Sequence, residues 1–104
     1  MNIAKMMKQA QQMQKKMGEM QAELATKEVS ASVAGGKVTV VANGAGEVLS
    51  IKIDPAVVDP EDIELLEDLV LSGVKQAIEQ GKEMSQAEMG KLTAGLGLPP
   101  GLGF

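Results

Sequence analysis

The chain has 104 residues and a formal net charge of −4, with no cysteine, histidine, tyrosine or tryptophan and with Phe104 as its only aromatic residue. These absences exclude a disulfide framework and remove the usual general base and the thiolate and imidazole metal ligands. The length predicts one small domain, residues 1–94, whose core would gain from a partner subunit that shares apolar surface. No apolar run approaches the roughly 18 residues of a membrane span, and no signal peptide is recognisable. We therefore expect a soluble cytoplasmic protein that is not an enzyme and that uses no cofactor and no metal.

The charge is distributed unevenly along the sequence. Residues 1–18 contain four lysines and no acid, which gives +4, whereas residues 54–68 contain seven acids and no lysine, which gives −7. Charge of one sign on one element can create a local field that the net charge hides.

The first predicted element is a helix over residues 2–26. Its apolar residues recur at alternating intervals of three and four, the pattern by which one helix packs along another. This methionine seam consists of Ile3, Met6, Ala10, Met13, Met17, Met20 and Leu24. Methionine suits an adaptable interface. We interpret the seam as core, and the sequence leaves open whether it packs within one subunit or between two.

The lysines of this helix lie outside the seam and are expected to face water. They are Lys5, Lys8, Lys15 and Lys16. Lysines on a helix commonly belong to a merely solvated face, but such a face usually mixes charges of both signs to gain i,i+4 pairs. Since no acid precedes Glu19, the sequence favours a basic contact surface.

Residues 27–53 change to a period of two, which predicts three short antiparallel strands in a meander. Gly35-Gly36 and the segment NGAG supply residues that tolerate the left-handed conformation of tight turns. We expect the third strand to place Leu49, Ile51 and Ile53 on one face. The three strand segments are EVSASVA, KVTVVA and EVLSIKI.

Residues 60–94 are predicted to be helical, with Asp59 as the N-cap and Pro60 at the first helical position. The acids that follow suit the positive end of the helix dipole. They lack the interleaved ligands and the central glycine of a calcium loop, so we do not predict a metal site there. We expect a break near Gly81. Packing against the first helix is expected from Met84, Met89 and Leu92.

The residue types also limit how this chain can bind nucleic acid. All ten basic residues are lysines, so arginine forks for base edges are missing, and so are aromatic side chains on which bases stack. Lysine contacts with phosphates position a protein on duplex DNA without reading its sequence. Any DNA binding is therefore expected to be weakly sequence-specific.

The order of elements and four segments resemble the YbaB/EbfC family of nucleoid-associated proteins. The segments, in family order, are MMKQAQQMQKKM, ANGAGEVLSIKIDP, EDIELLEDLV and LGLPPGLGF. The resemblance implies an α+β homodimer with projecting terminal helices that bind double-stranded DNA, a location in the nucleoid, and roles in chromosome organisation and gene regulation. Carried onto this chain, the DNA-binding candidates are Lys5, Lys8, Lys15 and Lys16, with Lys82 and Lys91 as weaker candidates because Glu83 and Glu88 lie near them.

A protein-interaction adaptor is the alternative to a DNA-binding dimer. Residues 95–104 are rich in glycine, proline and leucine and are predicted to form a flexible tail. In the alternative, this tail and the methionine seam bind a partner protein, and any affinity for DNA is incidental.

Overall fold

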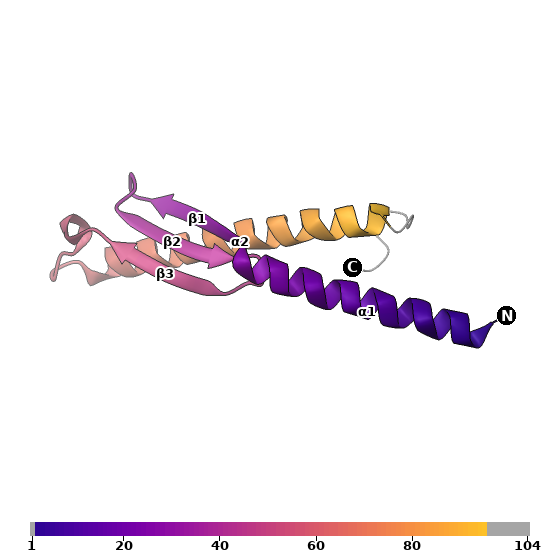
Figure 1. Cartoon of the computed structure of the whole chain (residues 1–104). Helices are drawn as coiled ribbons and strands as arrows, with labels where there is room; N and C mark the ends of the chain where they lie inside the picture. Colours follow the sequence, from indigo (N-terminus) through magenta and orange to yellow (C-terminus); the bar gives the residue numbers. More distant parts are fainter. Residues whose placement is uncertain (1, 96–104) are drawn as a thin grey trace.

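A computed structural model describes residues 2–95 of the chain, and the side chains of residues 2–91. The elements follow the order α-β-β-β-α (Figure 1), so the predicted α+β class and the three-stranded meander are confirmed. Their bounds are α1 Ile3–Thr26, β1 Glu28–Val33, β2 Val38–Asn43, β3 Val48–Ile53, the 3-10 turn η1 Pro55–Val57, and α2 Ile63–Gly95. The predicted tail lies outside the described residues, apart from Gly95 in α2.

The strands form one antiparallel sheet in the order β1-β2-β3. Helix α2 runs along one face of this sheet and continues beyond it, while α1 leaves the sheet at the same end (Figure 1). The two helices therefore form a fork on one end of the sheet. The molecule measures 70 × 21 × 17 Å along its principal axes.

The core lies between β2 and α2 and is built from small aliphatic side chains. Val38, Val40 and Ala42 alternate along β2 and have no exposed surface, and Ala31 of β1 and Ala77 of α2 pack with them. The alternation explains why this segment forms a strand with one covered face. Full burial of each valine contributes roughly 1.5–3 kcal/mol.

The methionine seam of α1 is covered over only part of its length. Leu24 is buried, Met13, Met17 and Met20 are half-buried, and Met20 lines the cleft between α1 and α2, whereas Ile3 is 70% exposed. Because Lys91, near the end of α2, lies level with residues 16–23 of α1, the first turns of α1 extend past α2. The prediction that the whole seam is core is therefore wrong: within this chain only Leu24 of the seam is buried, and α2 does not reach the outer half of α1.

Strand β3 differs from the prediction in its pairing. Ser50 pairs with Val41 but Val48 pairs with Ala42, so Leu49 is the extra residue of a β-bulge. The bulge shifts the alternation, and Val48 takes the place expected for Leu49 on the face of Ile51 and Ile53. No pattern in the sequence marks such an insertion.

The start and the middle of α2 also differ from the prediction. The N-cap is Asp62, whose Oδ1 accepts from the Leu65 amide at 3.3 Å, whereas Asp59 accepts from the Glu61 amide at 2.9 Å in a preceding turn. The helix also continues through Gly81 without a break. Gly81 is buried against the backbone of Asn43, where a Cβ would lie 2.6 Å from the carbonyl oxygen. Close packing, rather than a helix end, accounts for this glycine.

The chain is too extended to cover its own apolar surface. Its radius of gyration is 19.2 Å, against about 13 Å for a compact domain of this length. Its accessible surface is 7169 Å², against about 5,600 Å² for a monomeric protein of this mass. A large uncovered surface remains, and all six residues of β3 are exposed.

Candidate nucleic-acid interface

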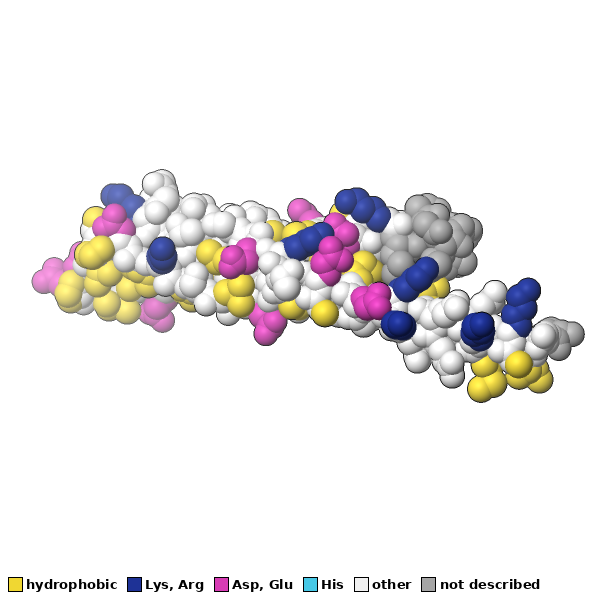
Figure 2. All heavy atoms as spheres, viewed as in Figure 1, with side chains coloured by type: hydrophobic (Ala, Val, Ile, Leu, Met, Phe, Trp, Pro, Cys, Tyr) yellow, Lys and Arg dark blue, Asp and Glu magenta, His cyan; other side chains and the backbone are white. Residues whose placement is uncertain are grey.

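The outer half of α1 presents the predicted lysines together on one side. We call residues 3–16 the basic arm. At 3.6 residues per turn its four lysines fall within an arc of about 100°, opposite the methionine seam. Figure 2 shows dark-blue lysine side chains along one side of this end of α1 and yellow apolar side chains on the other.

The lysines of the basic arm are not neutralised by neighbouring carboxylates. Lys5, Lys8, Lys15 and Lys16 are all exposed, and none of them forms an ion pair with any residue between 2 and 95. The first turn of α1 contains no acid, and its N-cap is Asn2, whose uncharged side chain accepts from the Lys5 amide at 3.2 Å. The positive end of the helix dipole therefore adds to the charge of the lysines.

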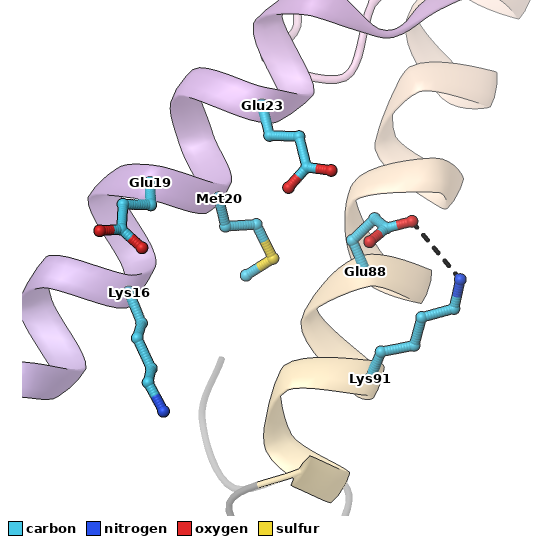
Figure 3. Close-up of a pocket in the computed structure, with 6 residues that line it drawn as sticks. All are labelled: Lys16, Glu19, Met20, Glu23, Glu88 and Lys91. Atoms are coloured by element: carbon cyan, nitrogen blue, oxygen red, sulfur yellow. Dashed lines mark ion pairs between the residues drawn. The ribbon is translucent and has the colours of Figure 1, made fainter.

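The root of the fork, in contrast, is a cluster of paired charges. Lys27, just after α1, donates to Glu88 of α2 at 3.2 Å and lies 3.6 Å from Glu23, while Lys91 lies 3.5 Å from Glu88. The hydrogen bond from Lys27 lowers the pKa of Glu88, and the same bond raises the pKa of Lys27. Lys27 thus links Glu23 of α1 to Glu88 of α2, whereas the Lys91–Glu88 pair lies within α2. A cleft of about 310 Å³ lies between the two helices beside these pairs. Figure 3 shows Met20 and Glu23 of α1 turned towards α2 across this cleft.

The two weaker candidates lie on α2, and only Lys82 is apart from the basic arm. Lys91 is paired with Glu88 and lines the same cleft as Lys16. Lys82 is exposed beside the turn between β2 and β3, in a groove of about 300 Å³ that also contains Ile78. The structure thus groups the four lysines of α1 and separates Lys82 from them.

Sequence reasoning missed Asn43, the buried polar residue at the root of α1. Its side chain is 2% exposed and forms hydrogen bonds to the end of α1 and to the turn that follows β2. The segment NGAG was a signal for the turn, but a turn asparagine usually faces solvent. Only the packing of Gly81 on Asn43 shows that this one is enclosed.

Other kinds of site find no support in the described part of the chain. Residues 2–95 contain no group of three or more acidic, histidine or cysteine side chains placed to hold a metal ion. Three of the seven acids between residues 54 and 68 cap turns or helices, namely Asp54, Asp59 and Asp62. Neither described helix is long and apolar enough to cross a membrane.

Comparison with known proteins decides the family. Residues 1–96 match the model of the YbaB/EbfC DNA-binding family. The chain belongs to this YbaB/EbfC family. The resemblance noted in the sequence is therefore confirmed, and the family is one of DNA-binding proteins rather than of enzymes.

Similar proteins carry the name nucleoid-associated protein. One, from Thermoanaerobacter sp. (strain X514), is 55% identical over 98 residues, which cover 94% of this chain and 88% of that protein. Another, from Akkermansia muciniphila, is 50% identical over the full length of both chains. The crystal structure of uncharacterized protein HP0035 from Helicobacter pylori has a TM-score of 0.65 at 21% identity, covering 77% of this chain and 93% of that one. This last likeness supports the fold alone.

Proposed function

We propose that this YbaB/EbfC protein is a homodimer that binds double-stranded DNA through the lysines of its basic arms, with little sequence preference. The observation that carries the proposal is the set of four exposed, unpaired lysines on the arm, in a protein that is acidic overall. Ammonium groups that have no carboxylate partner are free to contact phosphates without breaking existing ion pairs.

The distribution of charge orients the contact with DNA. Phosphates attract the arm and are repelled by the acids near the start of α2, at the far end of the sheet. At physiological salt this field acts over about 8 Å, so each part of an elongated molecule meets DNA according to its own charge. We infer that DNA contacts the arms and not the end of the sheet.

The lack of sequence preference follows from the residue types on the arm. Its polar side chains are those of lysine and glutamine. Lysine is a flexible point charge, and contacts to phosphate carry no direct base information. Such binding suits chromosome organisation over many sites in the nucleoid, and gene regulation would follow from occupancy at promoters rather than from recognition of one operator.

We infer the dimer from exposed apolar side chains of β3 and α2. We call this surface the apolar flank; it consists of Ile51, Ile53, Leu71 and Ile78. Ile51 and Ile53 pair with the buried face of β2, yet they are 42% and 40% exposed because α2 packs mainly on β1 and β2. Leu71 and Ile78 lie seven residues apart on one side of α2 and are exposed next to this strand, since Ile78 lines the groove at the β2–β3 turn. A second copy of the chain would cover these side chains and bring the number of arm lysines to eight.

A matched pair of charge variants tests DNA binding. Lys5→Gln, Lys8→Gln and Lys15→Gln together remove three charges from each arm. The control removes three exposed, unpaired lysines elsewhere, at Lys37, Lys52 and Lys75. Affinity for random duplex DNA would be measured by fluorescence anisotropy across a salt series.

The arm variant is expected to bind DNA far more weakly than the control. For a dimer that loses six phosphate contacts, the slope of log affinity against log salt should become shallower by up to about 5, since each contact contributes about −0.9. Equal losses in the two variants would refute the role of the arm. Single Lys82→Gln and Lys91→Gln variants are expected to change the slope by less than one contact.

The dimer is tested by Ile51→Asp, which places a charge on the apolar flank. Sedimentation should show a dimer for the parent protein and a monomer for the variant, with a salt slope about half that of the dimer. Leu65→Asp is the control, because Leu65 is 48% exposed but lies on the opposite side of α2. A dimer that survives Ile51→Asp would exclude the flank as the interface.

A protein-interaction adaptor remains the second candidate, because the apolar side of the arm is uncovered. Ile3, Met6 and Met7 are each more than half exposed. The contribution of the tail, residues 96–104, lies outside the described residues. Replacing Met6 and Met7 by glutamine keeps the helix and the lysines. Loss of a co-purifying protein with unchanged affinity for DNA would favour the adaptor.

A further inference from the structure

We propose that Asn43 and Gly44 are positioning residues that fix the direction of α1, and hence of the basic arm, relative to the sheet. This inference rests on the proposed function, because a fixed direction matters only if the arm is what contacts DNA. Neither residue touches DNA in this proposal. They act on the last turn of α1, at the opposite end of the helix from Lys5 and Lys8.

The first observation is that Gly44 holds the C-terminal end of α1 through its backbone. Its amide donates to the Leu24 carbonyl at 3.0 Å and to the Lys27 carbonyl at 3.1 Å. Leu24 is 1% exposed and is the one buried residue of α1. The carbonyl groups at a helix end need such partners, and here a single amide from the next turn provides two of the bonds.

The second observation is that Asn43 joins α1 to the same turn through its side chain. Its Nδ2 donates to the Ala25 carbonyl at 3.2 Å and to Glu47 Oε1 at 3.0 Å. Its Oδ1 accepts from the amides of Ala45 and Glu47, both at 3.0 Å. An asparagine side chain can donate two hydrogen bonds and accept two, so its capacity is fully used. Because the Asn43 side chain is buried, breaking one of these hydrogen bonds leaves a polar atom with neither a protein partner nor water to bond to.

The third observation is that a side chain does not fit at Gly44 without displacing its neighbours. A Cβ on Gly44 would lie 2.8 Å from Leu24 Cδ2 and 2.9 Å from Met84 Cε, so α1, the turn and α2 meet at this glycine. Gly81 brings α2 equally close to Asn43. The root therefore has hydrogen bonds and close packing that both depend on one orientation of α1.

The length of α1 makes its orientation at the root important for DNA binding. Lys5 lies 19 residues before Leu24, which is about 28 Å along a helix. A tilt of about 10° at the root would move Lys5 by about 5 Å, which exceeds the ~2.8 Å length of a charged hydrogen bond to phosphate. In a dimer, the two arms engage one duplex with high effective concentration only if both directions are defined.

The direction of the arm can be measured without DNA, by electron spin resonance distances between nitroxide labels. The chain has no native cysteine, so Gln12→Cys on α1 and Gln86→Cys on α2 provide two exposed attachment points. Labelled protein would be mixed with excess unlabelled protein, so that only distances within one subunit are observed. The labelled pair is then combined with Asn43→Ala or Gly44→Ala, and with Gly18→Ala as the control, because nothing lies within 4 Å of a Cβ at Gly18.

We expect a narrow distance distribution in the parent and in Gly18→Ala, and a broadened or displaced one in Asn43→Ala and Gly44→Ala. Both root variants should bind DNA about tenfold or more weakly, because a misdirected arm loses part of the avidity of the pair. Unchanged distances in both root variants would overturn the proposal. Changed distances with unchanged affinity for DNA would also overturn it, because the direction would then not matter for binding.

A double variant keeps the test decisive if the root variants unfold. Asn43→Asp with Glu47→Gln retains both bonds to the turn amides and restores a donor between residues 43 and 47, but it removes the donor to the Ala25 carbonyl. A broadened distance in this variant supports the positioning role, and an unchanged one contradicts it. Failure of the proposed function appears elsewhere, as unchanged DNA affinity in the variant lacking Lys5, Lys8 and Lys15.

Discussion

The basic arm and strand β2 both carry apolar residues at the regular spacing of their element, yet these residues lie in opposite environments. Every second residue of β2 is fully buried between the sheet and α2, whereas Ile3 of the arm is 70% exposed. The pattern of a sequence specifies which face of an element is apolar. Whether that face is covered depends on the length of the neighbouring elements, and α2 ends before it reaches the outer turns of α1. An apolar pattern thus predicts which face of an element is apolar, but it does not predict that this face is buried.

The basic arm also differs from the rest of the molecule in how its charges are partnered. At the root of the fork, Lys27 has carboxylate partners on both helices, and near the start of α2 aspartates cap backbone amides. The lysines of the arm have no such partners among residues 2–95. The charges at the root form ion pairs that stabilise the fold, whereas the lysines of the arm are free to contact a polyanion.

The largest effect on stability is expected from Leu24→Ala. This side chain is enclosed at the root by Gly44, and truncation of a buried leucine typically costs about 2–5 kcal/mol. Ile3→Ala, at the exposed end of the same seam, should cost about 0.5 kcal/mol or less. Urea unfolding monitored by circular dichroism would measure both. Similar costs for the two would mean that the arm is covered in solution.

Most of the fold was accessible from the sequence because its periods are clear. The seven-residue seam of α1 and the alternation along β2 predicted each element to within a few residues. The basic arm was predictable as well, since the helical spacing of the apolar residues places the four lysines on the other side and no acid precedes Glu19. The exposure of its apolar side was not predictable, because the sequence does not show where α2 ends relative to α1.

The details that sequence reasoning missed depend on contacts between distant segments. The bulge at Leu49 and the continuity of α2 through Gly81 follow from the pairing of β3 and from the packing of α2 on Asn43. Ala34 joins Gly35 in the left-handed region, with φ 55° and 67°, which an alanine adopts only when the hairpin around it requires it. Local propensity does not contain such information.

The next largest loss of stability is expected from a change at the start of α2. Asp62→Ala removes the side chain that accepts from the Leu65 amide, and loss of an N-cap costs about 0.5–2 kcal/mol. Asp59→Ala is the matched control, because its bond lies in the turn before the helix. Thermal unfolding would rank the two. A larger loss for Asp59→Ala would show that the helix begins earlier in solution.

A smaller, stabilising effect is expected from a change in α1 next to the arm. Gly18 lies within α1 in open space, and replacing a glycine by alanine inside an exposed helix contributes about 0.5–1 kcal/mol. Hydrogen exchange of the amides in residues 6–18 should therefore slow by about two- to fivefold. Exchange in β2 should not change, because the arm opens independently of the core. Equal slowing in both regions would indicate that arm and sheet unfold together.

The smallest expected effect is the pH dependence of the stability that the Lys27–Glu88 pair contributes at the root. The bond from Lys27 lowers the pKa of Glu88 below its ordinary value of 4.5, so its contribution to stability is present above pH 4.5 and is lost as the pH falls through the pKa in the folded protein. The pKa of Lys27 is raised above 10.5, so its contribution is present below that pH and is lost as the pH rises through the raised value. Urea unfolding of Glu88→Gln should therefore show a small loss of stability relative to the parent between about pH 5.5 and 9.5.

As the pH falls from 4.5 through the lowered pKa of Glu88, the difference between Glu88→Gln and the parent should shrink, because Glu88 then becomes protonated in the folded as well as in the unfolded parent protein. Glu83→Gln, an exposed carboxylate on α2 without an ion pair among residues 2–95, is the control and should follow the parent at every pH. A difference for Glu88→Gln that persists unchanged at pH 3 would mean that packing of the side chain, and not its charge, joins α2 to the end of α1. The contrast between paired charges at the root and unpaired charges on the arm would then lose its electrostatic basis.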